Sequence, residues 1–150
     1  MEVQYGARKD IRAWMRLVRE VSWNFPGLET EDDLLQHQST VLRFMGENRA
    51  ICVKEQEEII GVLLFSRKQN RICFLAVSPA HRRQGVATML MREALKKLDK
   101  KRDILVTTFR AEDEKGVAPR RLYRNFGFVA GELKEEFGYP QQEFILHTTR

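Results

Sequence analysis

Cysteine is scarce in this sequence. Its 150 residues include two cysteines, Cys52 and Cys73, each alone inside an apolar run. This excludes a disulfide framework and a Cys-x-x-Cys metal or redox motif. We expect two buried free thiols, because free cysteine packs as a small apolar residue. The nine glycines and four prolines are too few for a collagenous or low-complexity chain.

Long hydrophobic runs are also absent. The longest apolar stretch, Ile59 to Phe65, contains a glycine and is far shorter than the roughly 18 residues that span a bilayer. The opening MEVQYGARKD lacks the apolar segment of a signal peptide. These features predict a soluble, cytoplasmic protein that does not act at a membrane.

Residue patterns for metal binding and covalent catalysis are missing. His37, His81 and His147 are far apart in sequence and form no metal-binding motif, so we expect no metal. Neither a Gly-x-Ser-x-Gly elbow nor a convincing Cys/His pair is present. Any group transfer is therefore expected to be direct.

The composition fits one ordinary globular domain. The residues are 43% hydrophobic and 31% charged, and a chain of this length buries about 70% of its unfolded surface. No repeat, low-complexity tract or Ser/Gly-rich linker divides the sequence, so we expect a single domain over residues 1–150.

Positive charge is concentrated in the middle of the chain. The net charge is +5, and residues 81–102 contain eight basic and two acidic side chains. An anion site is expected there. The basic residues from Arg82 to Arg102 are not interleaved with Phe, Tyr or Trp, so a nucleic-acid partner is not favoured.

Apolar periodicity predicts a mixed α+β fold in the order β-α-α-β-β-β-α-β-α-β-β. Asp10 is expected to cap the first helix, and Thr30 with Asp33 resembles a capping box for the second. Strands are expected at residues 3–7, 50–54, 59–67, 71–77, 104–109, 128–136 and 143–147. Helices are expected from Ile11, from Thr30 to Gly46, from Val86 and from Pro119.

The segment Leu75 to Met91 places a basic loop between a strand and a helix. Unpaired N–H groups and the macrodipole make a helix N-terminus an anion site. A pyrophosphate is expected on the backbone amides of Gln84, Gly85, Val86, Ala87 and Thr88. Arg82 and Arg83 add forked donors. The loop alone is equally compatible with a solvated basic turn, because R-x-x-G-x-A is short.

Two motifs together resemble the GNAT superfamily of acetyl-CoA-dependent N-acetyltransferases. The family's pyrophosphate motif is matched by Val77, Pro79, Arg82, Gly85 and Ala87, and its later L-Y…G-F motif by Leu122, Tyr123, Gly127 and Phe128. The resemblance implies a mostly antiparallel twisted sheet of about seven strands flanked by about four helices. It also implies that acetyl-CoA binds along Leu75, Ala76 and Val77 and on the basic loop.

The sequence departs from the family pattern in two places. Gly116 and Pro119 stand where many relatives carry an Asn and an Ala. Arg120, Arg121 and Arg124 are candidates to replace the lost cofactor contacts electrostatically. The strand ICFLAV lacks the glutamate base that several relatives carry.

Acetyl transfer needs a proton acceptor for the amine, an oxyanion site and a proton for the thiolate. Glu112 and Asp113 are candidate bases, although AEDEK also reads as a charged surface loop. The resemblance implies that a bulged strand end turns the amides of Ala76 and Val77 toward the thioester. Tyr123 is the expected acid, and a core tyrosine is the alternative.

The acceptor is expected to be a small-molecule or peptide amine. The segment WNFPGLETEDD offers Trp23 and Phe25 for apolar contact and Glu29, Glu31, Asp32 and Asp33 to attract a cation, unless these acids only cap a helix. Glu135, Glu136 and Tyr139 are candidates for the opposing wall. A homodimer is compatible with the sequence. The competing function is a non-catalytic acyl-CoA-binding module of the same fold.

Overall fold

The computed structural model describes residues 1–148. Over these residues seven strands form one sheet in the order β1-β2-β3-β4-β5-β7-β6, with every neighbouring pair antiparallel except β4 and β5. The strands are β1 (Val3–Tyr5), β2 (Ala50–Glu55), β3 (Glu58–Ser66), β4 (Arg71–Val77), β5 (Ile104–Phe109), β6 (Val129–Glu136) and β7 (Tyr139–Leu146).

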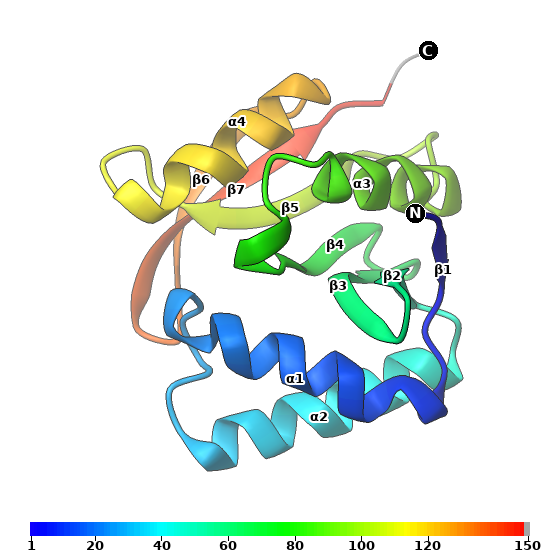
Figure 1. The fold of residues 1–150 in the computed structure, drawn as a ribbon. Helices are drawn as coiled ribbons and strands as arrows, with labels where there is room; N and C mark the ends of the chain where they lie inside the picture. Colours follow the sequence, from blue (N-terminus) through cyan, green and yellow to red (C-terminus); the bar gives the residue numbers. More distant parts are fainter. Residues whose placement is uncertain (149–150) are drawn as a thin grey trace.

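Two helices cover each face of the sheet, as Figure 1 shows, with α1 and α2 on one side and α3 and α4 on the other. The helices are α1 (Ile11–Val21), α2 (Glu31–Gly46), α3 (Val86–Lys97) and α4 (Val117–Asn125). The α+β fold and its predicted element order are confirmed. None of the helices in the described part of the chain has the length and apolarity to cross a bilayer.

The central strands are apolar on both faces because each face carries its own core. Along β3, Val62 and Leu64 pack with α1 and α2, whereas Leu63 and Phe65 pack with α3 and α4. This alternation follows from the two-residue period of a strand. Gly61 allows α3 to approach closely, since a Cβ there would lie 2.5 Å from Cγ1 of Val86. The N-terminal end of α3 is thereby held against the sheet.

The caps of the first two helices differ in kind. Thr30 and Asp33 form the predicted capping box at α2, where each side chain accepts from the other residue's N–H. Asp10 occupies the predicted N-cap position of α1, but its side chain makes no capping hydrogen bond to that helix. Its carboxylate instead accepts from the Ala7 N–H across the 3₁₀ turn Arg8–Asp10 and pairs with Lys54 of β2.

The sheet opens between β4 and β5. These strands pair only where Arg71 and Ile72 face Leu105 and Val106, and they are unpaired with each other beyond this point. The closed end is held by Asn70, which donates to the carbonyls of Asp99 and Asp103.

A β-bulge shapes β4 just beyond the closed end. The β3 and β4 register shifts between Leu64 and Phe65, which pair with Phe74 and Ile72 and leave Cys73 as the extra residue. Cys52 is buried, as predicted. Cys73 is exposed, so the prediction that it is buried is wrong. The bulge places Cys73 beside the opening rather than inside the core.

Candidate functional site

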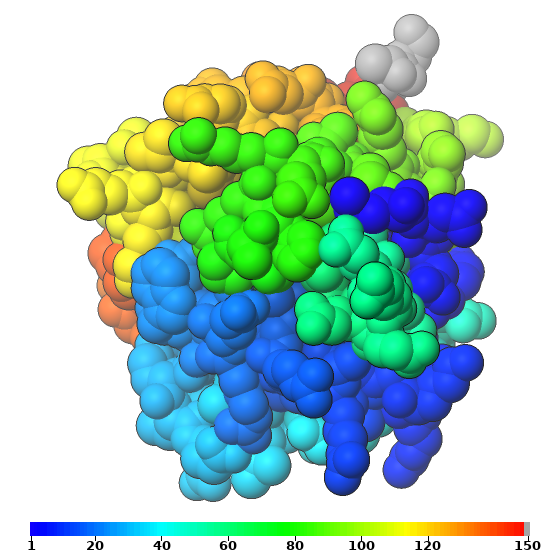
Figure 2. All heavy atoms as spheres, in the orientation of Figure 1, coloured from blue at the N-terminus to red at the C-terminus, as the bar shows by residue number. Residues whose placement is uncertain are grey.

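A cleft of about 1250 Å³ occupies the opening between β4 and β5. Its walls come from these two strands, the N-terminal ends of α3 and α4, α2, the α1–α2 loop and the tip of the β6–β7 hairpin. In the space-filling view the end of α1, the loop before α3 and the turn before α4 gather at one side of the molecule (Figure 2). Segments far apart in sequence therefore meet at one site.

The pairing of β4 with β3 decides which amides of β4 face this cleft. The Ser78 N–H donates to the Ile60 carbonyl on β3, and amides along a strand alternate between its two edges. Ala76 therefore points its N–H toward β3, opposite Val62. Leu75 and Val77 point theirs at the unpaired edge. The geometry thus favours Leu75 and Val77 over the predicted Ala76 as amide donors in the cleft.

The N-terminus of α3 forms the basic end of the cleft. Gly85 precedes the helix with a φ of 78°, and a Cβ at this position would meet nothing within 4 Å. Arg83 also has a positive φ, of 64°. The predicted binding residues that line the cleft are Leu75, Ala76, Val77, Arg82, Arg83, Gly85, Val86, Ala87 and Thr88; Gln84 does not. One cleft therefore contains nearly the whole predicted set.

Tyr123 reaches the cleft from α4. The side chain is 5% exposed and packs among Phe128 and Phe144. Burial raises the pKa of its phenol above the ordinary value, so the hydroxyl keeps its proton at neutral pH. A buried, protonated phenol at the wall of a cleft can donate a hydrogen bond to a bound ligand.

The start of α4 differs from the sequence prediction. The helix begins at Val117, two residues before Pro119, which occupies a first-turn position where a missing N–H costs no helical bond. Gly116 is required by packing, since a Cβ there would lie 3.0 Å from Cβ of Phe109. The N-terminal turn of α4 consequently lines the cleft.

The three arginines of α4 have different roles. Arg120 donates to the Phe109 carbonyl and lies over the Phe144 ring, and Arg124 lies over the same ring. Only Arg121 of the three lines the cleft. The prediction that all three could serve the cofactor is narrowed to Arg121, because the other two guanidinium groups are used within the fold.

The predicted bases lie outside the cleft. Neither Glu112 nor Asp113 is among its lining residues. Asp113 accepts from the Tyr139 hydroxyl at 2.6 Å and from the Lys115 N–H, and the Tyr139 hydrogen bond is the main cause of its lowered pKa. Asp113 thus caps a turn. Glu136 is the member of the predicted opposing wall that does line the cleft, whereas Glu135 and Tyr139 do not.

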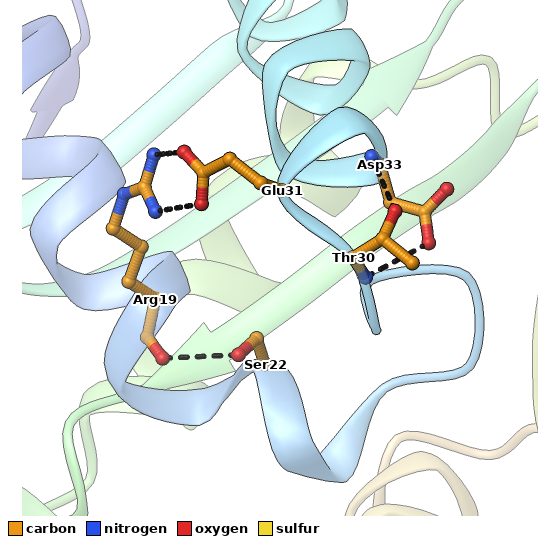
Figure 3. A network of polar contacts seen from close by, with 5 residues as sticks. All are labelled: Arg19, Ser22, Thr30, Glu31 and Asp33. Carbon is orange, nitrogen blue, oxygen red and sulfur yellow. Dashed lines mark hydrogen bonds and ion pairs between the residues drawn. The ribbon is translucent and has the colours of Figure 1, made fainter.

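The acidic loop before α2 is used internally, as Figure 3 shows. Glu31 forms a two-pronged pair with Arg19, and Asp33 accepts from the Thr30 N–H. Glu29 accepts from the Gly27 N–H. The alternative interpretation, in which these acids cap a helix, therefore holds for Asp33, whereas Glu31 is held by Arg19 of α1.

Aromatic side chains line the cleft where the α1–α2 loop forms its wall. The rings of Phe25 and Phe74 lie 4.7 Å apart between centroids, and those of His37 and Phe74 lie 4.8 Å apart. Phe137, at the tip of the β6–β7 hairpin, completes this group. The sequence indicated Trp23 and Phe25 but not Phe74, His37 or Phe137. These belong to three separate elements, and no local pattern joins them.

His37 is neutral in this surrounding. Burial lowers its pKa to about 4, and its Nε2 atom is sealed from solvent without a hydrogen-bond partner in the described structure. Across residues 1–148, no group of three or more His, Cys, Asp or Glu side chains is arranged to hold a metal ion.

Comparisons with known proteins agree on one family. Residues 27–140 match the family described as "Acetyltransferase (GNAT) domain". None of the curated proteins compared with the sequence matches it significantly.

Solved structures of similar shape extend over nearly the whole chain. A GNAT-family acetyltransferase from Bacillus cereus has 21% identity and a TM-score of 0.75, covering 99% of this chain and 98% of its own. An N-acetyltransferase from Staphylococcus aureus Mu50 has 14% identity and a TM-score of 0.76, covering 97% and 100%. A PaiA N-acetyltransferase from Thermoplasma acidophilum, in complex with coenzyme A, has 15% identity and a TM-score of 0.67, covering 99% and 98%. At these identities the likeness shows a shared fold.

Proposed function

Because this chain belongs to the GNAT acetyltransferase family, we propose that it transfers the acetyl group of acetyl-CoA to a primary amine. One observation carries the proposal: the unpaired edge of β4 and the Gly85 end of α3 lie in the same cleft as Tyr123. An acyl group, its anionic carrier and a proton donor can therefore be held together.

The basic end of the cleft suits the pyrophosphate of coenzyme A. The first amides of α3 lack intrahelical partners, and Arg82 and Arg83 supply permanent positive charge beside them. Gly85 leaves its side of the loop open to a ligand. The coenzyme A complex of the Thermoplasma acidophilum protein supports this assignment.

The transfer needs no covalent enzyme intermediate. The neutral amine attacks the thioester carbon, and the tetrahedral oxyanion accepts a hydrogen bond from the Val77 amide. The C–S bond then breaks, and Tyr123 donates its proton to the departing thiolate. Glu136 lines the cleft and is the carboxylate to which we assign the amine proton, with water as the relay.

Two measurements test the proposal. Acetyl-CoA should bind in calorimetry and raise the melting temperature, and binding should weaken as salt screens the arginines. Free thiol should then appear when an amine is added, with the acetylated amine identified by mass. Binding of acetyl-CoA without transfer to any amine would favour the non-catalytic module. Absence of binding would overturn the proposal.

A further inference from the structure

We infer that the acceptor is a small monoamine carried on an apolar body, such as an arylalkylamine, and that it binds among Phe25, Phe74 and Phe137. This inference rests on the proposed function and goes further by naming the class of amine. Three observations support it: the wall is aromatic, few carboxylates in it are free of partners, and Phe137 contacts Gly27 across the opening of the cleft.

The wall itself is aromatic. The Phe25 and Phe74 rings are tilted by 38° with their centroids 4.7 Å apart, and the His37 ring lies 4.8 Å from that of Phe74, so three rings adjoin in one wall of the cleft. Because His37 is neutral, this surface carries no positive charge that would repel an amine. Pockets lined by rings with few polar groups bind ligands with apolar bodies.

The cleft offers little negative charge to an acceptor with several ammonium groups. Of the charged groups at this end, Asp33 belongs to the α2 cap and Arg71 pairs with Glu143. Glu136 is half-buried, lines the cleft and has no salt bridge in the described part of the chain. Glu114 also lines the cleft but lies exposed in the turn before α4, beside Lys115. One half-buried carboxylate suits one ammonium group.

The β6–β7 hairpin contacts the α1–α2 loop across the opening of this part of the cleft. The Phe137 ring lies against Gly27, where a Cβ would come within 2.9 Å of its Cγ atom. Gly27 has a φ of 85°, so glycine is favoured there on two grounds. The β6–β7 hairpin thus touches the α1–α2 loop. A polypeptide laid across the cleft would have to displace this contact, whereas a small amine would not.

The test compares acceptors of matched reactivity and different bodies. Phenethylamine, tryptamine and hexylamine form the apolar set, and ethylamine, spermidine and a lysyl peptide form the contrast set. We expect kcat/KM to be at least about tenfold higher for the apolar set, since each additional buried apolar group contributes roughly tenfold or more. Ligand-observed NMR of phenethylamine gives a binding readout that does not require turnover.

A matched pair of variants locates the effect. Phe137→Ala should reduce kcat/KM for phenethylamine about tenfold more than it reduces kcat/KM for ethylamine, because ethylamine has no ring to pack against Phe137. Leu133→Ala is the control, because Leu133 lies on the same hairpin, is 58% exposed and does not line the cleft. Phe137 is 77% exposed, so neither change should impair folding.

The outcomes separate this inference from the proposed function. A preference for spermidine or the lysyl peptide overturns the inference while the acetyltransferase assignment stands. Failure of every amine, with acetyl-CoA bound, overturns the inference and leaves only a cofactor site. If Phe137→Ala lowers kcat/KM equally for phenethylamine and ethylamine, the aromatic wall does not select the acceptor, and the inference is overturned.

Discussion

The Tyr123 side chain lines the cleft and that of Tyr139 does not, so the two tyrosines form a matched pair for single-residue tests. Tyr123→Phe should lower kcat by about 10²–10⁴-fold, because it removes the proposed proton donor while deleting one oxygen atom. Its melting temperature should change little. The measurement is single-turnover acetyl transfer at saturating substrate beside a thermal melt.

Tyr139→Phe supplies the control. Its hydroxyl donates to Asp113 outside the cleft, so the variant should lose a little stability and keep its turnover. A drop in kcat below about threefold for Tyr123→Phe would reject this residue as the acid.

His37 makes stability depend on pH in a definite direction. Its pKa is lowered from the ordinary 6.5 to about 4, so the unfolded chain binds this proton more readily than the folded one. The stabilisation is present above pH 6.5 and is lost as the pH falls toward 4, by a total of about 3 kcal/mol. Urea unfolding at pH 7.5 and 4.5 measures it.

His37→Gln should flatten this dependence relative to the unchanged protein. Parallel curves for His37→Gln and the unchanged chain would show that the buried imidazole is not the titrating group.

Single residues also show how far the sequence predicts the site. Tyr123 and the loop from Arg82 to Thr88, apart from Gln84, line one cleft, and each could be singled out because it lies in a local motif. Phe74 and Phe137 were not predicted, because their meeting depends on how β4 and a distant hairpin are arranged. Asp113 was assigned as a base on charge alone, although its oxygens serve a turn.

At the scale of elements, the N-terminus of α3 can be tested with two glycines of similar conformation. Gly85 and Gly138 have φ values of 78° and 72°, and a Cβ at either meets nothing within 4 Å. Alanine at either position should cost about 1 kcal/mol of stability, because an L-residue is strained there. Only Gly85→Ala should also weaken acetyl-CoA binding, by at least about tenfold.

Calorimetry on both variants checks this prediction, with urea unfolding as the measure of strain. Equal affinities for acetyl-CoA in the two variants would contradict the assignment of α3 to the pyrophosphate.

Element boundaries mark where local patterns are weak. The order of strands and helices was predicted correctly, since β3 is a continuous apolar run and apolar residues recur at helical spacing in α3. The strand predicted from Glu143 instead begins at Tyr139, four residues earlier. Pro140 pairs with Glu135 of β6, and the other edge of β7 is unpaired at this residue because the pairing with β5 reaches only Gln141, so a proline is tolerated there.

At the scale of the whole molecule, Asn70 joins two parts of the sheet. Its side chain is 1% exposed, donates to the Asp99 and Asp103 carbonyls and accepts from the Asp99 N–H. Asn70→Ala should lower the free energy of unfolding by about 3 kcal/mol, because these buried groups lose their partners. Urea unfolding measures the loss.

Asn48→Ala controls for backbone strain, since Asn48 and Asn70 have φ values of 55° and 53° and Asn48 is exposed. A similar loss in both variants would assign the effect to conformation rather than to the bridge.

The parting of β4 from β5 has a consequence for the exchange of backbone hydrogen with deuterium. Amides in the middle of a large sheet ordinarily exchange slowly, because each is held by a neighbouring strand. Along β4 the Ala76 amide should be slow, whereas the Leu75 and Val77 amides should exchange faster by orders of magnitude in the free protein. Acetyl-CoA should slow these two selectively. Fast and slow exchange would then alternate residue by residue within one central strand.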